Sequence, residues 1–273
     1  MGNGGSIQNG DYARANAALS VCRIDACTFV VEMDGRVALF DPWLYDPAKF
    51  APLWGSYHEE PLVIRALPQP DILFISQDAP DHCDVRAISE LSKDMDVIAP
   101  SAAARKLQKM GLTVQPMEAG QSKLVRDIKI SAIPSEHPGV LKQNGYLLEG
   151  KSSKILVLAD PALKPDLAAA VDALPKPIDA ILLASTGFTL RHFGQIVMQP
   201  EEAAEIVARA AARHAFPTRT LMHEGVWGLL GRVLVKSFVT PEESFRRFSD
   251  ELRRIAPTTA IHRLDRGQGC LVT

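Results

Sequence analysis

Two apolar runs joined by a tight turn open the patterned part of the chain. Residues 27–32 and 36–41 are rich in Val, Phe and Leu, and Asp34-Gly35 lies between them. An Asp-Gly pair between two apolar runs indicates a β-hairpin, because these residues tolerate the positive φ angles of its turn. Pro42 follows the second run and cannot donate a ladder hydrogen bond, so the second strand is predicted to end there.

The rest of the chain alternates between strand-like and helical runs, after a Pro-rich stretch at 45–68 that is expected to be irregular. Further strands are predicted at 71–75, 96–99, 113–115, 127–133, 145–149, 154–159, 180–184, 218–222, 259–263 and 269–272. Helices are predicted at 85–93, 101–110, 165–173, 201–214 and 241–255, with Ser101 and Thr240 as N-caps. Two runs of strands, each followed by α/β alternation and a closing helix, predict an α/β sandwich rather than a doubly wound sheet.

Composition and charge indicate one globular domain. The 273 residues are 47% hydrophobic and 23% charged, and the formal net charge is −2. This balance gives no electrostatic reason to expect nucleic acid or an anionic membrane as a partner. No apolar run approaches the roughly 20 residues that cross a bilayer, and no signal peptide is evident. We therefore expect a flexible leader at 1–19, a single domain at 20–273 and a cytoplasmic location, with an organelle after transit-peptide removal as the alternative.

The four cysteines do not predict a disulfide framework. Cys22, Cys27, Cys83 and Cys270 are scattered and form no Cys-x-x-Cys pair. Reduced thiols are expected, and a thiolate zinc knuckle is not.

A dense polar loop at 76–84 follows the expected strand 71–75. Adjacent Asp81 and His82 can chelate one cation through a carboxylate oxygen and an imidazole nitrogen. Turn formation and capping are the alternative explanation for such a pair. The other candidate ligands also follow expected strands; they are His137, Asp160 and His223.

The order of these motifs resembles the metallo-β-lactamase superfamily over nearly the whole chain. The loop Ser76-Gln77-Asp78-Ala79-Pro80-Asp81-His82 is similar to the family's T-H-x-H-x-D-H signature. Further matches in order are Asp41-Pro42, Pro134-Ser-Glu-His137, the paired runs that end at Asp160, Met198-Gln-Pro-Glu-Glu-Ala203 and Met222-His223. The arrangement is most similar to the branch of L-ascorbate 6-phosphate lactonase and N-acyl-phosphatidylethanolamine phospholipase D. The resemblance implies a four-layer αββα sandwich.

The resemblance also implies a reduced metal site. Gln77 and Ala79 occupy the positions of the two His residues in H-x-H, and Ala has no donor atom. The second site's ligands all have counterparts, which are Asp81, His82, Asp160 and His223. We therefore expect one divalent ion, with zinc expected first and iron or manganese as alternatives.

The remaining candidates have roles that the resemblance implies around that ion. His137 is a further ligand candidate and, without a full first site, a general acid or base; its alternative is a hydrogen-bonding partner of a ligand. Gln77 would position water or substrate, and Asp81 counts as a catalytic residue as well as a ligand. Arg191 and His192 are candidates for binding an anionic group of a small-molecule substrate, with solvated loop charge as the alternative for Arg191.

Three functions follow from this set. The first is a metal-dependent hydrolase of an ester, lactone or phosphate-type bond. The second is an inactive member of the fold that binds a ligand or partner, which the loss of both H-x-H histidines favours. The third is redox or oxygen chemistry at a single iron, for which two His and carboxylates suffice.

Overall fold

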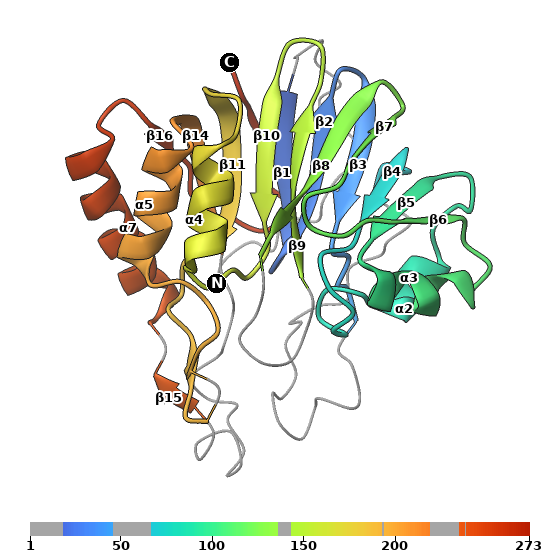
Figure 1. The fold of residues 1–273 in the computed structure, drawn as a ribbon, viewed down its shortest axis with the longest axis horizontal. Coiled ribbons are helices and arrows are strands. Elements are labelled where there is room, and N and C mark those ends of the chain that lie inside the picture. Colours follow the sequence, from blue (N-terminus) through green and yellow to red (C-terminus); the bar gives the residue numbers. More distant parts are fainter. Residues whose placement is uncertain (1–18, 46–66, 136–142, 193, 219–234, 238) are drawn as a thin grey trace, which may run out of the picture.

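The computed structural model describes residues 19–45, 67–135, 143–192, 194–218, 235–237 and 239–273. Within these residues, two seven-stranded sheets pack face to face, and a three-stranded sheet lies at one end of them (Figure 1).

The first sheet has the strand order β17-β1-β2-β3-β4-β5-β6. Its strands are β1 (Leu19–Asp25), β2 (Thr28–Met33), β3 (Arg36–Phe40), β4 (Ile72–Phe74), β5 (Asp96–Ala99), β6 (Val114–Pro116) and β17 (Gly269–Leu271). The pairs from β17 to β3 are antiparallel, whereas β3, β4, β5 and β6 run parallel to one another. Parallel strands end at the same edge of a sheet, so the segments after β3 and β4 emerge side by side.

The second sheet has the order β16-β14-β11-β10-β9-β8-β7. Its strands are β7 (Ser122–Val125), β8 (Ile128–Pro134), β9 (Asn144–Glu149), β10 (Lys154–Leu158), β11 (Ile178–Ala184), β14 (Ala212–Thr218) and β16 (Ala260–Ile261). Strands β10, β11, β14 and β16 are parallel. The small sheet contains β12 (Thr189–Leu190), β13 (Gly194–Gln195) and β15 (Val235–Ser237).

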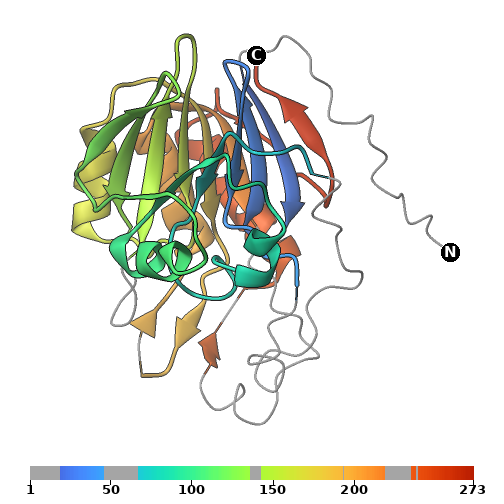
Figure 2. The same cartoon turned by 90° about the vertical axis from the view of Figure 1, so that its right-hand side faces the viewer.

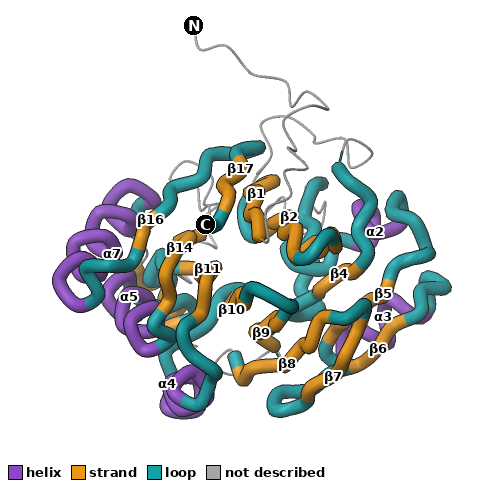
Figure 3. Tube along the Cα trace, turned by 90° about the horizontal axis from the view of Figure 1, so that it is seen from above, coloured by secondary structure: helices purple, strands orange, loops and turns teal. Residues whose placement is uncertain are grey.

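Helices cover the outer faces of both sheets, which completes four layers (Figure 3). Those of the first sheet are α2 (Val85–Ser89) and α3 (Ser101–Gln108), and those of the second are α4 (Pro165–Asp172), α5 (Pro200–Arg209) and α7 (Pro241–Ile255). Figure 2 shows the two sheets from the side, with α2 and α3 toward the viewer. The predicted αββα sandwich is confirmed. None of the described helices is both long and apolar enough to span a membrane.

The apolar core between the sheets holds them in register. Inward-facing residues of both sheets form one buried cluster, which includes Phe40, Phe74, Tyr146 and Leu182. The rings of Phe40 and Phe74 stack at 4.6 Å, and Tyr146 from the second sheet lies 5.2 Å from Phe74. The Tyr146 hydroxyl donates to the Ile75 carbonyl at 2.8 Å, so burying this ring leaves no phenol unpaired.

The predicted hairpin at Asp34-Gly35 is confirmed. Asp34 and Gly35 have φ values of 49° and 76°, the left-handed conformation that a two-residue hairpin turn requires. The helix 241–255 is also confirmed, with the Thr240 hydroxyl accepting from the Glu243 amide at its start.

The helix predicted at 201–214 is wrong after residue 209. The helix ends at Arg209, Ala211 has a φ of 47°, and Ala212–Thr218 forms β14 in the middle of the second sheet. Ala and Arg favour helix locally, but pairing with β11 on one side and β16 on the other overrides that preference. The strand predicted at 218–222 is therefore placed too late, and its residues after 218 lie outside the described part.

Several smaller predictions also need correction. Ser101 is not an N-cap, because Pro100 occupies that position and Ser101 is the first helical residue. The helix predicted at 85–93 ends at Ser89. The strand pattern missed β1, β7, β12, β13 and β15, most of which are short or half-exposed and therefore carry little apolar periodicity.

The core between the sheets predicts that replacing a buried leucine lowers the free energy of unfolding far more than replacing an exposed one. Leu182→Ala removes a fully buried side chain from the core and should lower the free energy of unfolding by about 2–5 kcal/mol. Leu124 is 73% exposed, so Leu124→Ala should change it by less than about 0.5 kcal/mol. Urea unfolding of both variants measures the difference, and equal effects would contradict this account of the core.

Candidate metal centre

The candidate site forms where strands of both sheets end. Asp41 directly follows β3, and Ser76 follows β4, its parallel neighbour. Asp160 follows β10 of the second sheet. His82 lies in the loop after β4 and is 1% exposed, and its ring contacts groups from both sheets.

One side of the His82 ring is fixed by a carboxylate. Its Nδ1 lies 2.9 Å from Oδ2 of Asp41. The same Oδ2 accepts from the Ser76 hydroxyl at 2.6 Å, and Oδ1 accepts from the Ser76 amide at 2.7 Å. Asp41 has a φ of 42°, a conformation that costs energy for a residue with a Cβ, although Asp adopts it more often than most residues do. Asp41 is therefore locked in place and sets the orientation of the imidazole.

The other side of the ring faces two more carboxylates. Nε2 of His82 lies 3.1 Å from Oδ2 of Asp160 and 3.8 Å from Oδ2 of Asp81. Asp160 comes from the second sheet and Asp81 from the same loop as His82. One nitrogen thus faces oxygen atoms that arrive from opposite layers of the sandwich.

Neighbouring contacts hold the loop in position. The Lys106 ammonium of α3 donates to the carbonyls of Asp78 and Cys83. The backbone amide of Asn144 in β9 donates to the Ser76 carbonyl at 3.0 Å. Asp84 caps α2 by accepting from two backbone amides, so its carboxylate has a structural role. These contacts fix both ends of the loop that carries His82.

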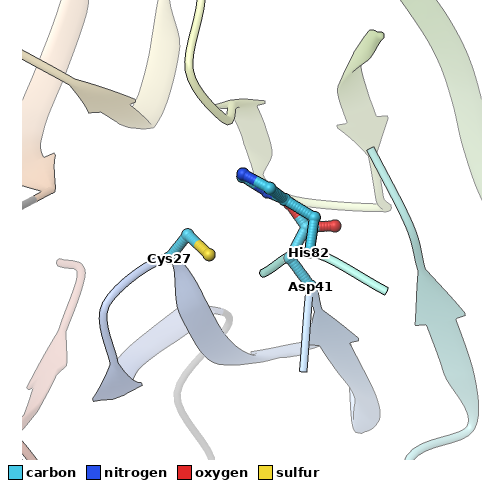
Figure 4. Close-up of side chains that lie close together, drawn as sticks. All are labelled: Cys27, Asp41 and His82. Atoms are coloured by element: carbon cyan, nitrogen blue, oxygen red, sulfur yellow. The ribbon is translucent and has the colours of Figure 1, made fainter. Parts of the chain in front are cut away.

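Cys27 is a further donor beside the ring. It lies in the turn between β1 and β2, and its thiol donates to the Asp81 carbonyl at 3.3 Å. Cys27, Asp41 and His82 each offer a donor atom, and these atoms all lie within 4.8 Å of one another (Figure 4). Burial raises the pKa of the Cys27 thiol to about 12, although the neighbouring His82 opposes the shift. The thiol is therefore protonated at neutral pH unless a cation replaces its proton.

The charge balance raises the pKa of His82. Burial alone would lower it, but the carboxylates of Asp81, Asp41 and Asp160 outweigh burial and hold the pKa well above its ordinary value. A buried carboxylate such as that of Asp41 needs a nearby cation, and in this arrangement the His82 ring supplies one by keeping its proton.

The donor set at Nε2 fits a divalent ion. Bonds of about 2.0–2.1 Å in tetrahedral geometry separate neighbouring ligand atoms by about 3.4 Å. The distances of 3.1 and 3.8 Å from Nε2 to the two carboxylates bracket that separation. A ligand histidine usually has its second ring nitrogen hydrogen-bonded to a carboxylate or carbonyl, and Asp41 meets that requirement.

Some of the predicted site residues lie together at the site, some are exposed on a turn, and others lie outside the described residues. The structure brings Asp81, His82 and Asp160 together, and it places Gln77 in the same loop, where it is 3% exposed. Arg191 and His192 are exposed in the turn between β12 and β13. His137 and His223 lie outside the described residues. Cys83 is buried in the apolar cluster on the helix-covered face of the first sheet.

Sequence reasoning did not assign Asp41, Ser76 or Cys27 to the site. Asp41 had a detectable signal, since it is a polar residue directly after a buried strand and precedes Pro42. Ser76 belonged to the polar loop but had no separate role. Cys27 gave no signal, because a single cysteine in a hairpin turn has no ligand spacing.

Comparison with known proteins finds relatives both by sequence and by fold. Residues 36–218 match the family model described as the Beta-lactamase superfamily domain. A UPF0173 protein of Pyrococcus furiosus is 30% identical over 161 residues, which cover 58% of this chain and 68% of that protein.

Two solved structures share the fold at low identity. An isothiocyanate hydrolase from Delia radicum gut bacteria superposes with a TM-score of 0.70 and 15% identity, covering 92% of this chain and 98% of that one. CmlA, a diiron β-hydroxylase from Streptomyces venezuelae, gives a TM-score of 0.68 and 17% identity, covering 93% of this chain and 54% of that one.

The charges around His82 predict that this histidine keeps its proton above the ordinary histidine pKa in the metal-free protein. Because the folded-state pKa of His82 is raised, the stabilisation it provides is complete below the unfolded value of about 6.5 and is lost as pH rises through the folded-state pKa. Imidazole nitrogen NMR of metal-free protein should therefore show His82 still protonated above pH 6.5. His262 provides the comparison, because burial and His214 lower its pKa. Titration of both rings near or below 6.5 would contradict the charge balance described above.

Proposed function

The chain belongs to the beta-lactamase superfamily, and we propose that it is a metal-dependent hydrolase of an ester, lactone or phosphate-type bond with a one-ion site. One observation carries the proposal. Nε2 of His82 faces the carboxylates of Asp81 and Asp160, while its Nδ1 is held by Asp41. Such an arrangement leaves one imidazole nitrogen and two carboxylates available to a single cation.

The proposed ligands are Asp81, His82, Asp160 and His223, the last outside the described residues. Zinc is the proposed ion, and iron or manganese would accept the same nitrogen and oxygen donors. One solved structure with this fold is a diiron enzyme, which supports a metal in general rather than one metal in particular.

The first metal position of the family is proposed to be absent. Ala79 offers no donor atom, and Gln77 offers an amide oxygen, a weaker zinc ligand than imidazole. We propose likewise that the loop at 76–82 is a degenerate form of the family's metal-binding motif, and that the chain is most similar to the lactonase and phospholipase D branch.

The bound ion would supply a water of lowered pKa and would polarise a carbonyl or phosphoryl oxygen. The protein's own groups then bind and orient the substrate. Gln77 is proposed to hydrogen-bond the substrate or the attacking water, and His137 to transfer a proton as general acid or base. Arg191 and His192 are exposed beyond β12 and are proposed to bind an anionic group of a small-molecule substrate.

Ala79 and Gln77 also favour a second function, in which the chain keeps the fold and binds a ligand or partner without catalysis. A scaffold of that kind has no reason to retain a cation. Metal content therefore separates the two functions before any substrate is known.

Metal content is the first test. Wild-type protein purified without added metal should contain close to one equivalent by plasma mass spectrometry. His82→Ala should contain almost none, because it removes the nitrogen on which the carboxylates converge. His214→Ala, a histidine on β14 that contacts His262 rather than the site, should retain the metal and serves as the control.

The outcomes are distinct. One equivalent that is lost only in His82→Ala supports the hydrolase and justifies a screen of esters, lactones and phosphodiesters. Two equivalents would show that the one-ion count is wrong. No metal in the wild type, even after incubation with zinc, iron or manganese, would exclude the hydrolase and leave the binding scaffold.

Asp41 should matter for affinity without contacting the ion. Asp41→Asn keeps the shape of the side chain but weakens its hold on Nδ1 of His82, so metal affinity should fall by about 10- to 100-fold. Competition with a chromophoric chelator measures the change. The exposed Asp94→Asn removes the same charge elsewhere and should bind like the wild type. Equal affinity of the two variants would contradict the orienting role of Asp41.

A further inference from the structure

We propose that Cys27 is a thiolate ligand of the same metal ion, an inference that rests on the proposed function. Cys27 is not part of the motif from which the other ligands were predicted. It comes from the turn between β1 and β2, whereas the other described ligands follow β4 and β10.

Position is the first argument. The Cys27 sulfur, a His82 nitrogen and an Asp41 oxygen lie within 4.8 Å of one another, and the three side chains converge in Figure 4. The Cys27 thiol also reaches the backbone carbonyl of Asp81 at 3.3 Å. The sulfur thus lies beside the His82 ring and beside the backbone of Asp81, which are two of the proposed ligand residues.

The second argument concerns the hydrogen bonds that Asp41 and Cys27 already make. Both oxygens of Asp41 accept short hydrogen bonds, from the Ser76 amide and hydroxyl and from His82 Nδ1. Metal binding by Asp41 would break that network and release the His82 ring. The hydrogen bond of Cys27 is a weak thiol–carbonyl contact, so little is lost when the thiol exchanges it for a metal. Cys27 is therefore the better ligand of the two.

The third argument is chemical. Zinc is bound in proteins by Cys, His and carboxylate donors, and a thiolate binds zinc more strongly than an amide oxygen does. On binding, the S–H bond of Cys27 breaks, its proton passes to solvent, and a sulfur–metal bond forms without electron transfer. The thiolate would add a strong sulfur donor to the nitrogen of His82 and the carboxylates of Asp81 and Asp160.

Cobalt substitution tests this assignment without measuring activity. Co²⁺ replaces Zn²⁺ in such sites, and a bound thiolate gives an intense near-ultraviolet sulfur-to-cobalt charge-transfer band. The full-length wild type should show the band at one equivalent of Co²⁺. Cys27→Ser should bind one equivalent and lose the band.

Cys83→Ala is the matched control. Cys83 is adjacent to His82 in sequence, but its side chain packs in the core under the helices, so the band should remain. Circular dichroism of both variants verifies that they fold. The cobalt spectrum of the wild type tests the assignment even if a variant does not fold.

Each outcome decides the assignment. A band that is lost only in Cys27→Ser supports it. Stoichiometric Co²⁺ binding without a band in the wild type would overturn the Cys27 ligand and leave the proposed metal-dependent function standing. A band that survives Cys27→Ser would also overturn it. No cobalt binding at all, in protein that is folded, would overturn both proposals together.

Discussion

The hydrogen bond between Asp41 and His82 is the contact on which the rest of the site depends. It fixes one nitrogen of the ring, so the other nitrogen must face Asp160 and Asp81. Asp41 can do this because the Ser76 amide and hydroxyl stabilise its charge in a buried position. An amide, a hydroxyl and an imidazole together satisfy a carboxylate that would otherwise be costly to bury.

The sandwich supplies the distances that this network requires. Asp41 and Ser76 follow parallel neighbours in one sheet, whereas Asp160 follows a strand of the other. The aromatic contacts of Phe74 with Phe40 and Tyr146 fix how the two sheets face each other close to this edge. Close packing of these rings leaves little freedom for the sheets to slide, so the distance from His82 to Asp160 is a property of the core as much as of the loop.

Electrostatics explains why the site should attract a cation. Three carboxylates surround one buried imidazole, and without a metal the ring itself must carry the compensating positive charge. A divalent ion and the ring proton therefore compete for the same position, which couples metal affinity to pH. A protein that had lost every use for a cation would gain stability by replacing such a cluster with apolar residues. The presence of the cluster, beside Gln77 and Ala79 at the positions of the family's two histidines, is the physical basis on which we propose a reduced site rather than an abandoned one.

The sequence by itself determined the features that depend on near neighbours. Asp34-Gly35 specified a hairpin, Thr240 and the apolar period specified α7, and polar residues after apolar strands identified Asp81, His82 and Asp160 as candidates. Tertiary structure alone decided that 212–218 is a central strand, because pairing with β11 outweighs local helix propensity. It also decided that Asp41 and Cys27 join the site, across sequence separations of 41 and 54 residues. Local patterns report only on contacts within a few residues, whereas the packing of two sheets selects which distant side chains meet.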